Sequence, residues 1–415
     1  MKIGIAFGLG VFASVVPSLA HAQDEVLRGE TVMDRPRPDY DPVGVHLGGF
    51  TLYPGVTVQE SYDSNIYATP SNAVDDWITS VRPRVDLKSN WDEDSLNFHG
   101  GANIVRYANH DTENYEDYDF GADGKLVILH DARMLGNAGY NLEHLPRSSP
   151  NSISNQRELT QFSDTSAGLS GEKEFNWLSL KLDWNFDRYV FSDAQSNSGA
   201  LIAWGRQNFN ENRVTLHTGY EFVPGRQVYL LGAYDRRSYD NDSDMSGFNR
   251  NSDGYTVGAG LKYDLTGILF ADVFAGYREQ DYRDSRLGSL LGPTGGAKLT
   301  WNVTRLTTIT GSITRDVDET IFSNSAGYFA TREDLKIDHE LLRNLLINLT
   351  GGHEEDAFQG TERDDNVFNA GLGAQYLLSR MFQLKGGYTF QTRSSNQPGN
   401  SFDDHVVYLG LTTRL

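Results

Sequence analysis

The stretch Trp177–Val190 alternates between apolar and polar side chains, and this pattern limits what the chain can fold into. Successive side chains of a strand point to opposite faces, so the stretch predicts a strand with one oily face and one charged face. The oily face would carry Leu178, Leu180, Leu182, Trp184 and Phe186, and the charged face Ser179, Lys181, Asp183, Asn185 and Asp187. A strand of a soluble sandwich can alternate in the same way, so the rest of the chain must decide between the two.

The alternation recurs from Gly49 onward at intervals of roughly 20 residues, the spacing of membrane-spanning strands of about ten residues plus their connections. About eighteen segments show it, an even number as single-chain outer-membrane barrels require. The segments at 160–170 and 335–337 are weak, and sixteen strands is the alternative count.

The connections alternate between two kinds. Some are tight, such as Val223–Arg226 and Asp264–Gly267, and others are long and rich in Asp, Asn and Ser, such as Asp63–Asp76 and Pro146–Gln156. Short periplasmic turns that alternate with longer outer loops are typical of transmembrane barrels. Five of the six tryptophans lie near predicted strand ends, which indicates two aromatic girdles: Trp77, Trp91, Trp177, Trp204 and Trp301. The prediction is an all-β, transmembrane outer-membrane β-barrel of antiparallel strands, with both termini periplasmic.

The first residues predict export. Lys2, the apolar run Ile3–Ala20 and the small residues Ala20 and Ala22 make residues 1–22 a signal peptide, with an uncleaved anchor as the alternative. Residues 23–48 are polar and punctuated by proline, and we predict a flexible periplasmic extension, with a docking segment as the alternative. Residues 49–415 would then form the barrel.

Composition narrows the function classes. The chain has no cysteine, which excludes disulfides and thiolate metal sites, and a hydrophobic fraction of 38% is too polar for a helical membrane protein. A net charge of −20 argues against nucleic acid as a partner. The acidic residues concentrate in predicted loops such as 110–117, 240–244 and 362–365, so we expect an acidic, cation-favouring mouth.

Charged residues lie regularly on the face opposite the apolar set. An Arg or Lys facing lipid at mid-bilayer would cost about 2–4 kcal/mol, so this face is assigned to the lumen. The candidate pore-lining residues are Arg82, Arg84, Asp86, Lys125, Lys181, Asp183, Asp187, Arg213, Lys262, Asp272, Arg278 and Lys385.

The segment Tyr62-Asp63-Ser64-Asn65-Ile66-Tyr67, followed by Asp76, Pro83 and Trp91, resembles the start of the outer-membrane β-barrel porins of type 2. The resemblance implies a Tyr-Asp-x-Asn loop after the first strand and a later x-Pro that opens an extended segment. It also implies, for some members, an association with production of surface polysaccharide. The family-like residues are Tyr62, Asp63, Asn65, Asp76 and Pro83.

In His405–Leu415, the last residues given, apolar side chains alternate with other side chains as in a membrane-spanning strand. This is the pattern expected of the strand that barrel-insertion machinery recognises. Other expected partners are outer-membrane lipid and lipopolysaccharide of a Gram-negative cell. We expect no enzyme activity, cofactor or metal site, since His110, His130 and His405 lack the partners that nucleophilic catalysis needs.

The predicted function is a porin-like channel for passive diffusion of small hydrophilic solutes. The alternative is an accessory of surface polysaccharide export, which would contact a polysaccharide secretion complex through residues 24–48 or through the periplasmic turns.

Overall fold

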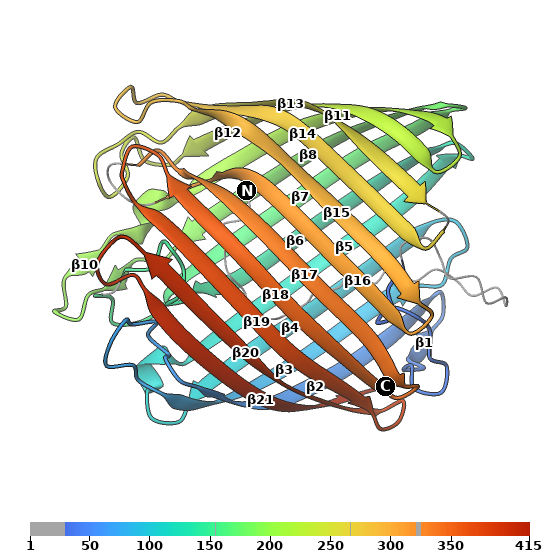
Figure 1. Cartoon of the computed structure of the whole chain (residues 1–415), viewed down its shortest axis with the longest axis horizontal. Helices are drawn as coiled ribbons and strands as arrows, with labels where there is room; N and C mark the ends of the chain where they lie inside the picture. The colour runs from blue at the N-terminus through green and yellow to red at the C-terminus, as the bar shows by residue number, and fades with distance from the viewer. Residues whose placement is uncertain (1–29, 154, 266, 321–324) are drawn as a thin grey trace.

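The computed structural model describes residues 30–153, 155–265, 267–320 and 325–415. These residues form a closed barrel of eighteen antiparallel strands, tilted across the barrel wall (Figure 1). Long connections gather at one end of the barrel and tight turns at the other, and we call these the long-loop end and the short-turn end. Among the described residues, no helix is long and apolar enough to cross a membrane.

The barrel strands before the long β8–β11 connection are β2 (Phe50–Asp63), β3 (Asp76–Ser89), β4 (Ser95–Tyr107), β5 (Tyr115–Leu129), β6 (Ala132–Leu145), β7 (Thr160–Phe175) and β8 (Leu178–Phe191). The strands after it are β11 (Phe209–Val223), β12 (Arg226–Tyr239), β13 (Ser252–Leu265), β14 (Leu269–Tyr282), β15 (Leu290–Thr304), β16 (Thr307–Asp318), β17 (Tyr328–Leu342), β18 (Leu345–Phe358), β19 (Asp364–Leu377), β20 (Phe382–Ser395) and β21 (Phe402–Arg414). The short strand β1 (Val45–Leu47) pairs with the start of β2. The connections hold β9 (Ala194–Gln195), β10 (Leu201–Ile202) and the 3-10 turns η1 (Asp111–Glu113) and η2 (Trp204–Gln207).

Each strand pairs with the next in sequence, and β8 pairs with β11 across the small β9–β10 hairpin. The last strand, β21, pairs with the first, β2, from Gly55 opposite Arg414 to Asp63 opposite Val406. This pairing removes the free edges that an open sheet would expose. The two weak segments are full strands, β7 and β17, so the count is eighteen and not sixteen.

The turns at the short-turn end are tight because local residues supply the backbone they need. Gly225, between β11 and β12, has φ +77°, a conformation that glycine adopts without a steric penalty. Its amide donates to the Glu221 carboxylate at 2.7 Å. Asn176 takes φ +58° between β7 and β8, and asparagine tolerates this conformation better than most residues.

The outer surface carries the apolar set that the alternation predicts. Leu182 is 54% exposed and Leu230 65% exposed, as expected of side chains that meet lipid. Trp77, Trp91, Trp177 and Trp301 are exposed near strand ends. The prediction for Trp204 is wrong: it lies in η2 with 1% of its surface exposed, stacked on Phe191 inside an apolar cluster.

Candidate functional site: the barrel lumen and its two mouths

The twelve charged residues expected in the lumen lie on the strand face opposite the exposed apolar side chains, so they point into the barrel. They come from β3, β5, β8, β11, β13, β14 and β20: Arg82, Arg84, Asp86, Lys125, Lys181, Asp183, Asp187, Arg213, Lys262, Asp272, Arg278 and Lys385. They do not converge on one point, because they are spread around the wall and along its height.

Away from the long-loop end, the inner wall carries ion pairs along and between strands. Arg84 lies 2.9 Å from Asp86 and 3.9 Å from Asp119 on β5. Lys181 lies 3.2 Å from Asp183. The side chains of Arg84 and Lys181 are nevertheless 38% and 42% exposed, although a closed wall surrounds them. The lumen beside these side chains therefore has room for water.

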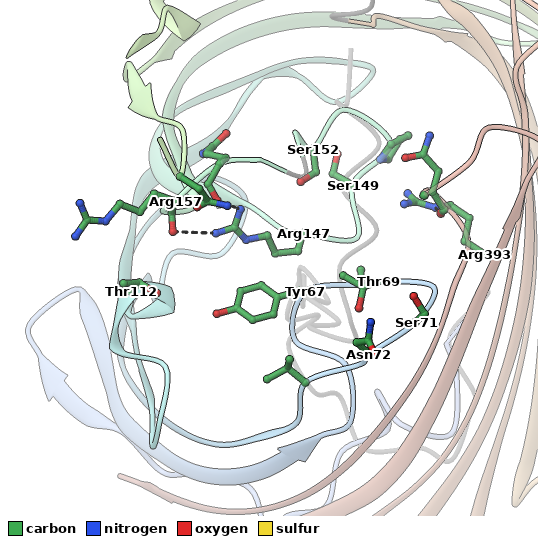
Figure 2. A pocket seen from close by; sticks show the side chains of 17 residues that line it. Tyr67, Thr69, Ser71, Asn72, Thr112, Arg147, Ser149, Ser152, Arg157 and Arg393 are labelled. Atoms are coloured by element: carbon green, nitrogen blue, oxygen red, sulfur yellow. Dashed lines mark hydrogen bonds between the residues drawn. The ribbon is translucent and has the colours of Figure 1, made fainter. Parts of the chain in front are cut away.

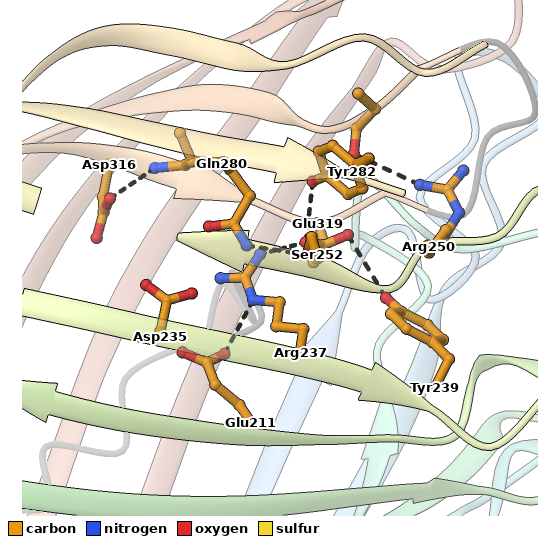
Figure 3. Close-up of polar contacts among 12 residues, drawn as sticks. Glu211, Asp235, Arg237, Tyr239, Arg250, Ser252, Gln280, Tyr282, Asp316 and Glu319 are labelled. Carbon is orange, nitrogen blue, oxygen red and sulfur yellow. Dashed lines mark hydrogen bonds and ion pairs between the residues drawn. The ribbon is translucent and has the colours of Figure 1, made fainter. Parts of the chain in front are cut away.

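Closer to the long-loop end, the inner wall holds a buried network of charges (Figure 3). Arg237 on β12, which is fully enclosed, donates from Nε to Glu211 at 3.0 Å and from Nη1 to Glu319, in the β16–β17 connection. The Tyr282 hydroxyl also donates to Glu319, at 3.0 Å. On the same wall Arg278 pairs with Asp235 at 2.9 Å. Glu319 thus draws its loop inward onto β12 and β14.

The β6–β7 loop, residues 146–159, crosses the long-loop end. Arg393 on β20 donates to the Ser148 carbonyl at 2.9 Å, and Arg363 donates to the Pro150 carbonyl at 3.3 Å. Further along the loop, the Asn151 amide donates to the Glu319 carbonyl at 3.3 Å. These contacts join β6–β7 to strands far around the ring, so the loop narrows this mouth.

A cavity of about 560 Å³ lies beneath this loop (Figure 2). It is bounded by the β2–β3 connection (Tyr67 to Val74), the β6–β7 loop and the β20–β21 connection with Arg393. Most lining side chains end in hydroxyl, amide or guanidinium groups, and no Asp or Glu is among the described residues that line it. Burial and the Glu113 carboxylate raise the pKa of Tyr67 on its wall, so this phenol stays a neutral hydroxyl.

The family-like residues organise the same mouth. Asn65 donates to the carbonyls of Thr69 and Asp403, both at 2.9 Å, and its Oδ1 accepts from the Thr69 amide at 3.1 Å. The Asp63 carboxylate accepts from the Asn65 amide at 2.8 Å. The motif therefore folds the β2–β3 connection and ties it to β21.

Two other family-like residues, Asp76 and Tyr62, make contacts close to Asn65 at the long-loop end. Asp76, whose side chain is fully buried, accepts from the Trp77 amide, the Asn109 amide and His110, at 2.7–3.0 Å. Tyr62 packs on the outer surface, with its ring 5.5 Å from that of Trp77.

Pro83 differs from the expectation. It lies inside β3, opposite Val56, rather than opening an extended segment. The β3–β4 pairing is interrupted between Val81 and Arg84 while the register stays the same, as expected where proline lacks a backbone donor.

The short-turn end holds the described part of the N-terminal segment, which we call the N-terminal strap (residues 30–41). The expected flexible extension over 23–48 does not fit residues 30–48. The Val32 amide donates to Thr308 at 2.9 Å, and Arg37, 3% exposed, pairs with Glu340 at 2.8 Å. Arginines of the barrel end donate to strap carbonyls, among them Arg414 to Tyr40 at 3.0 Å. The predicted signal peptide, residues 1–22, lies outside the described residues.

The histidines considered for catalysis lie apart. His110 contacts Asp76 and His405 contacts the Tyr388 hydroxyl at 2.8 Å, both at the long-loop end, while His130 follows β5 at the short-turn end. Among the described residues, no group of three or more His, Cys, Asp or Glu is arranged to hold a metal ion.

A closed antiparallel barrel with an apolar outer band and a charged, wetted interior defines a transmembrane β-barrel. Residues 37–415 match the family described as "Putative beta-barrel porin 2", and the chain belongs to this family. It is a porin-like β-barrel of the outer membrane.

Solved structures include similar barrels. OpdK of Pseudomonas aeruginosa with vanillate is 12% identical with TM-score 0.46, and the match covers 88% of this chain and 99% of that one. The siderophore receptor PirA of Acinetobacter baumannii is 10% identical with TM-score 0.46, over 87% of this chain and 80% of that one. A ferric enterobactin receptor mutant of Pseudomonas aeruginosa, in complex with enterobactin, is 9% identical with TM-score 0.45. The match covers 88% of this chain and 81% of that one. Comparison with curated proteins gives no match.

Proposed function

We propose that the protein is a channel for passive diffusion of small hydrophilic solutes across the outer membrane. The observation that carries this proposal is the exposure of inward-facing charged side chains of the wall, 42% for Lys181 and 38% for Arg84. A barrel of this strand number is wide enough for an aqueous passage unless loops fill it. The β6–β7 loop narrows one mouth and the N-terminal strap lies at the other, so the ends rather than the middle would limit flux.

The long-loop end would face the outside and the short-turn end, with both termini, the periplasm, because barrels of this class have short periplasmic turns. The described N-terminal residues and Leu415 both belong to the short-turn end, where the Leu415 amide donates to the Pro54 carbonyl at 3.1 Å.

The acidic, cation-favouring mouth is not part of this proposal. Three of the expected rim carboxylates are bound to arginines: Glu113 to Arg147, Asp244 to Arg250 and Asp365 to Arg363. The export alternative is left out as well. It relied on residues 24–48 or on the periplasmic turns to contact a secretion complex, and residues 30–48 are occupied by contacts with the barrel.

Single-channel recording of the refolded protein in a planar bilayer tests the proposal. We expect stable ohmic current steps. Because the chain has no cysteine, a single introduced thiol can then report the route. A charged methanethiosulfonate reagent should react with Lys181→Cys and reduce the conductance.

The matched control is Leu182→Cys, one residue along β8 but on the lipid face. It should leave the conductance unchanged under the same reagent. A folded, inserted protein that passes no current, or equal effects at positions 181 and 182, would overturn the proposed channel.

A further inference from the structure

The cavity at the long-loop end is lined by one arginine, Arg393, whose hydrogen-bond partners are all uncharged. Arg393 reaches it from β20 with 6% of its surface exposed, and it appears at the cavity edge in Figure 2. Its Nε donates to the Asn400 carbonyl and its Nη1 to the Ser148 carbonyl, at 2.5 and 2.9 Å. Neither partner is charged, and no carboxylate of the described residues lies within ion-pair distance of this guanidinium.

Neighbouring charges are matched among themselves. Arg147, on the opposite wall, donates to both oxygens of Glu113, at 3.0 and 2.7 Å. The carboxylate of Asp365 accepts from Arg363 and from the Ser395 hydroxyl. The guanidinium of Arg157 points away from the cavity in Figure 2. Asp365 and Asp356 act on Arg393 only from beyond ion-pair distance, so its guanidinium is the charged group of this wall that is left for a ligand.

The groups facing Arg393 are donors and acceptors suited to hydroxyls. Thr69, Ser71 and Asn72 line the cavity from the β2–β3 connection, and Ser149 and Ser152 line it from the β6–β7 loop (Figure 2). A volume of about 560 Å³ falls in the range of ligand pockets, roughly 300–1,000 Å³. Its volume and its lining are those of a site for a polar molecule of sugar size.

We propose that this cavity binds a small, polyhydroxylated monocarboxylate, a sugar acid, before it enters the lumen. Arg393 binds the carboxylate, since guanidinium pairs with carboxylate through charge-assisted hydrogen bonds. The hydroxyl and amide groups of Thr69, Ser71 and Asn72 bind the solute hydroxyls. This inference rests on the proposed channel function and names the solute class that the channel selects.

The experiment uses glucuronate as the probe and glucose as its uncharged counterpart. Glucuronate added at the long-loop side should interrupt the single-channel current briefly and in proportion to its concentration, while glucose should not. Calorimetric titration of the detergent-solubilised protein with each sugar gives a binding readout that does not depend on conduction.

Two substitutions test the assignment of Arg393. Arg393→Gln removes the charge, and Asn72→Asp adds an opposing charge from an exposed loop position without removing an Arg393 contact. Each should weaken glucuronate binding about tenfold or more, the loss expected when one charge-assisted hydrogen bond is removed or opposed. Arg393→Lys should retain part of the binding. Arg206→Gln, a charge change on an exposed residue of the same end outside the cavity, is the control.

The outcomes separate the two proposals. A conducting channel that binds glucuronate no better than glucose, or whose glucuronate binding is unaffected by Arg393→Gln and Asn72→Asp, overturns the cavity assignment and leaves the channel intact. A protein that binds glucuronate in the calorimeter but passes no current overturns the channel and leaves the binding site.

Discussion

Arg237 donates a hydrogen bond to Glu319, a residue 82 positions further along the chain, and the pair is enclosed on the inner wall of the barrel. The same guanidinium binds Glu211 at 3.0 Å, so one side chain joins two buried carboxylates from separate segments. The pair holds the start of the β16–β17 connection inward at the long-loop end, the mouth that the β6–β7 loop also narrows.

Replacing Arg237 by alanine should destabilise the barrel. Breaking a buried ion pair from one side costs roughly 3–5 kcal/mol, because it leaves uncompensated charge. Urea unfolding in detergent or lipid, followed by tryptophan fluorescence, measures the change. Arg236→Ala is the control: Arg236 is adjacent in β12 but exposed on the outer face. Equal losses for the two variants would contradict the assigned role.

Removing the N-terminal strap should widen the short-turn mouth. We expect a variant lacking residues 30–41 to conduct more than the full chain, since Val32 and Arg37 are buried against the barrel end. Arg37→Ala, which loses the 2.8 Å contact with Glu340, should reproduce part of the increase. Asp39→Ala, at an exposed position of the strap, should not. Unchanged single-channel conductance in both test variants would show that the strap does not limit flux.

Reversing a charge in the lumen should change ion selectivity. Arg84→Glu replaces a positive group on the inner wall by a negative one, beside Asp86 and Asp119. The reversal potential in a salt gradient should shift towards cation preference. Arg106→Glu makes the same charge change on the outer surface of β4 and should shift it little. If the two variants shift the potential equally, Arg84 does not face the ion path.

Removing the Asn65 side chain should loosen the long-loop end. Asn65→Ala loses hydrogen bonds to Thr69 and Asp403 at a site that is 4% exposed. Leaving such buried groups without partners costs about 1–3 kcal/mol. Thermal unfolding should show the loss, and limited proteolysis should cut the β2–β3 connection sooner. Ser71→Ala, exposed in the same connection, is the matched control, and identical behaviour would argue against the role of Asn65.

The strand pattern could be predicted because two different solvents act on it. Lipid on one side and water on the other impose a period of two, which is visible in Leu182 beside Lys181 and Asp183 without knowledge of any contact. That period leaves the choice between eighteen and sixteen strands open, because its two weakest segments are the strands β7 and β17.

The mouths could not be predicted in the same way. The contact of Arg393 with Ser148 joins residues 245 positions apart, and nothing local to either residue marks it. The strap looks like a linker in composition, yet it is held through carbonyl groups such as that of Tyr40, which every residue possesses. The prediction for Trp204 was wrong for the same reason. Its position near a predicted strand end indicated a membrane interface, but residues distant in the sequence form the apolar cluster that buries it.

The pairing of β21 with β2 has a consequence for biogenesis. The first strand of the wall finds its second neighbour only in residues 406–414, so its backbone groups on that side stay unpaired until translation has passed the final strand. Inside a bilayer each unpaired group costs several kcal/mol. A prematurely terminated chain would therefore carry an open edge that the membrane penalises along its whole length. The hydrogen bond from Asn65 to the Asp403 carbonyl forms at this same junction. Closure of the ring thus gives the finished molecule a stability in the membrane that a fragment without β21 lacks.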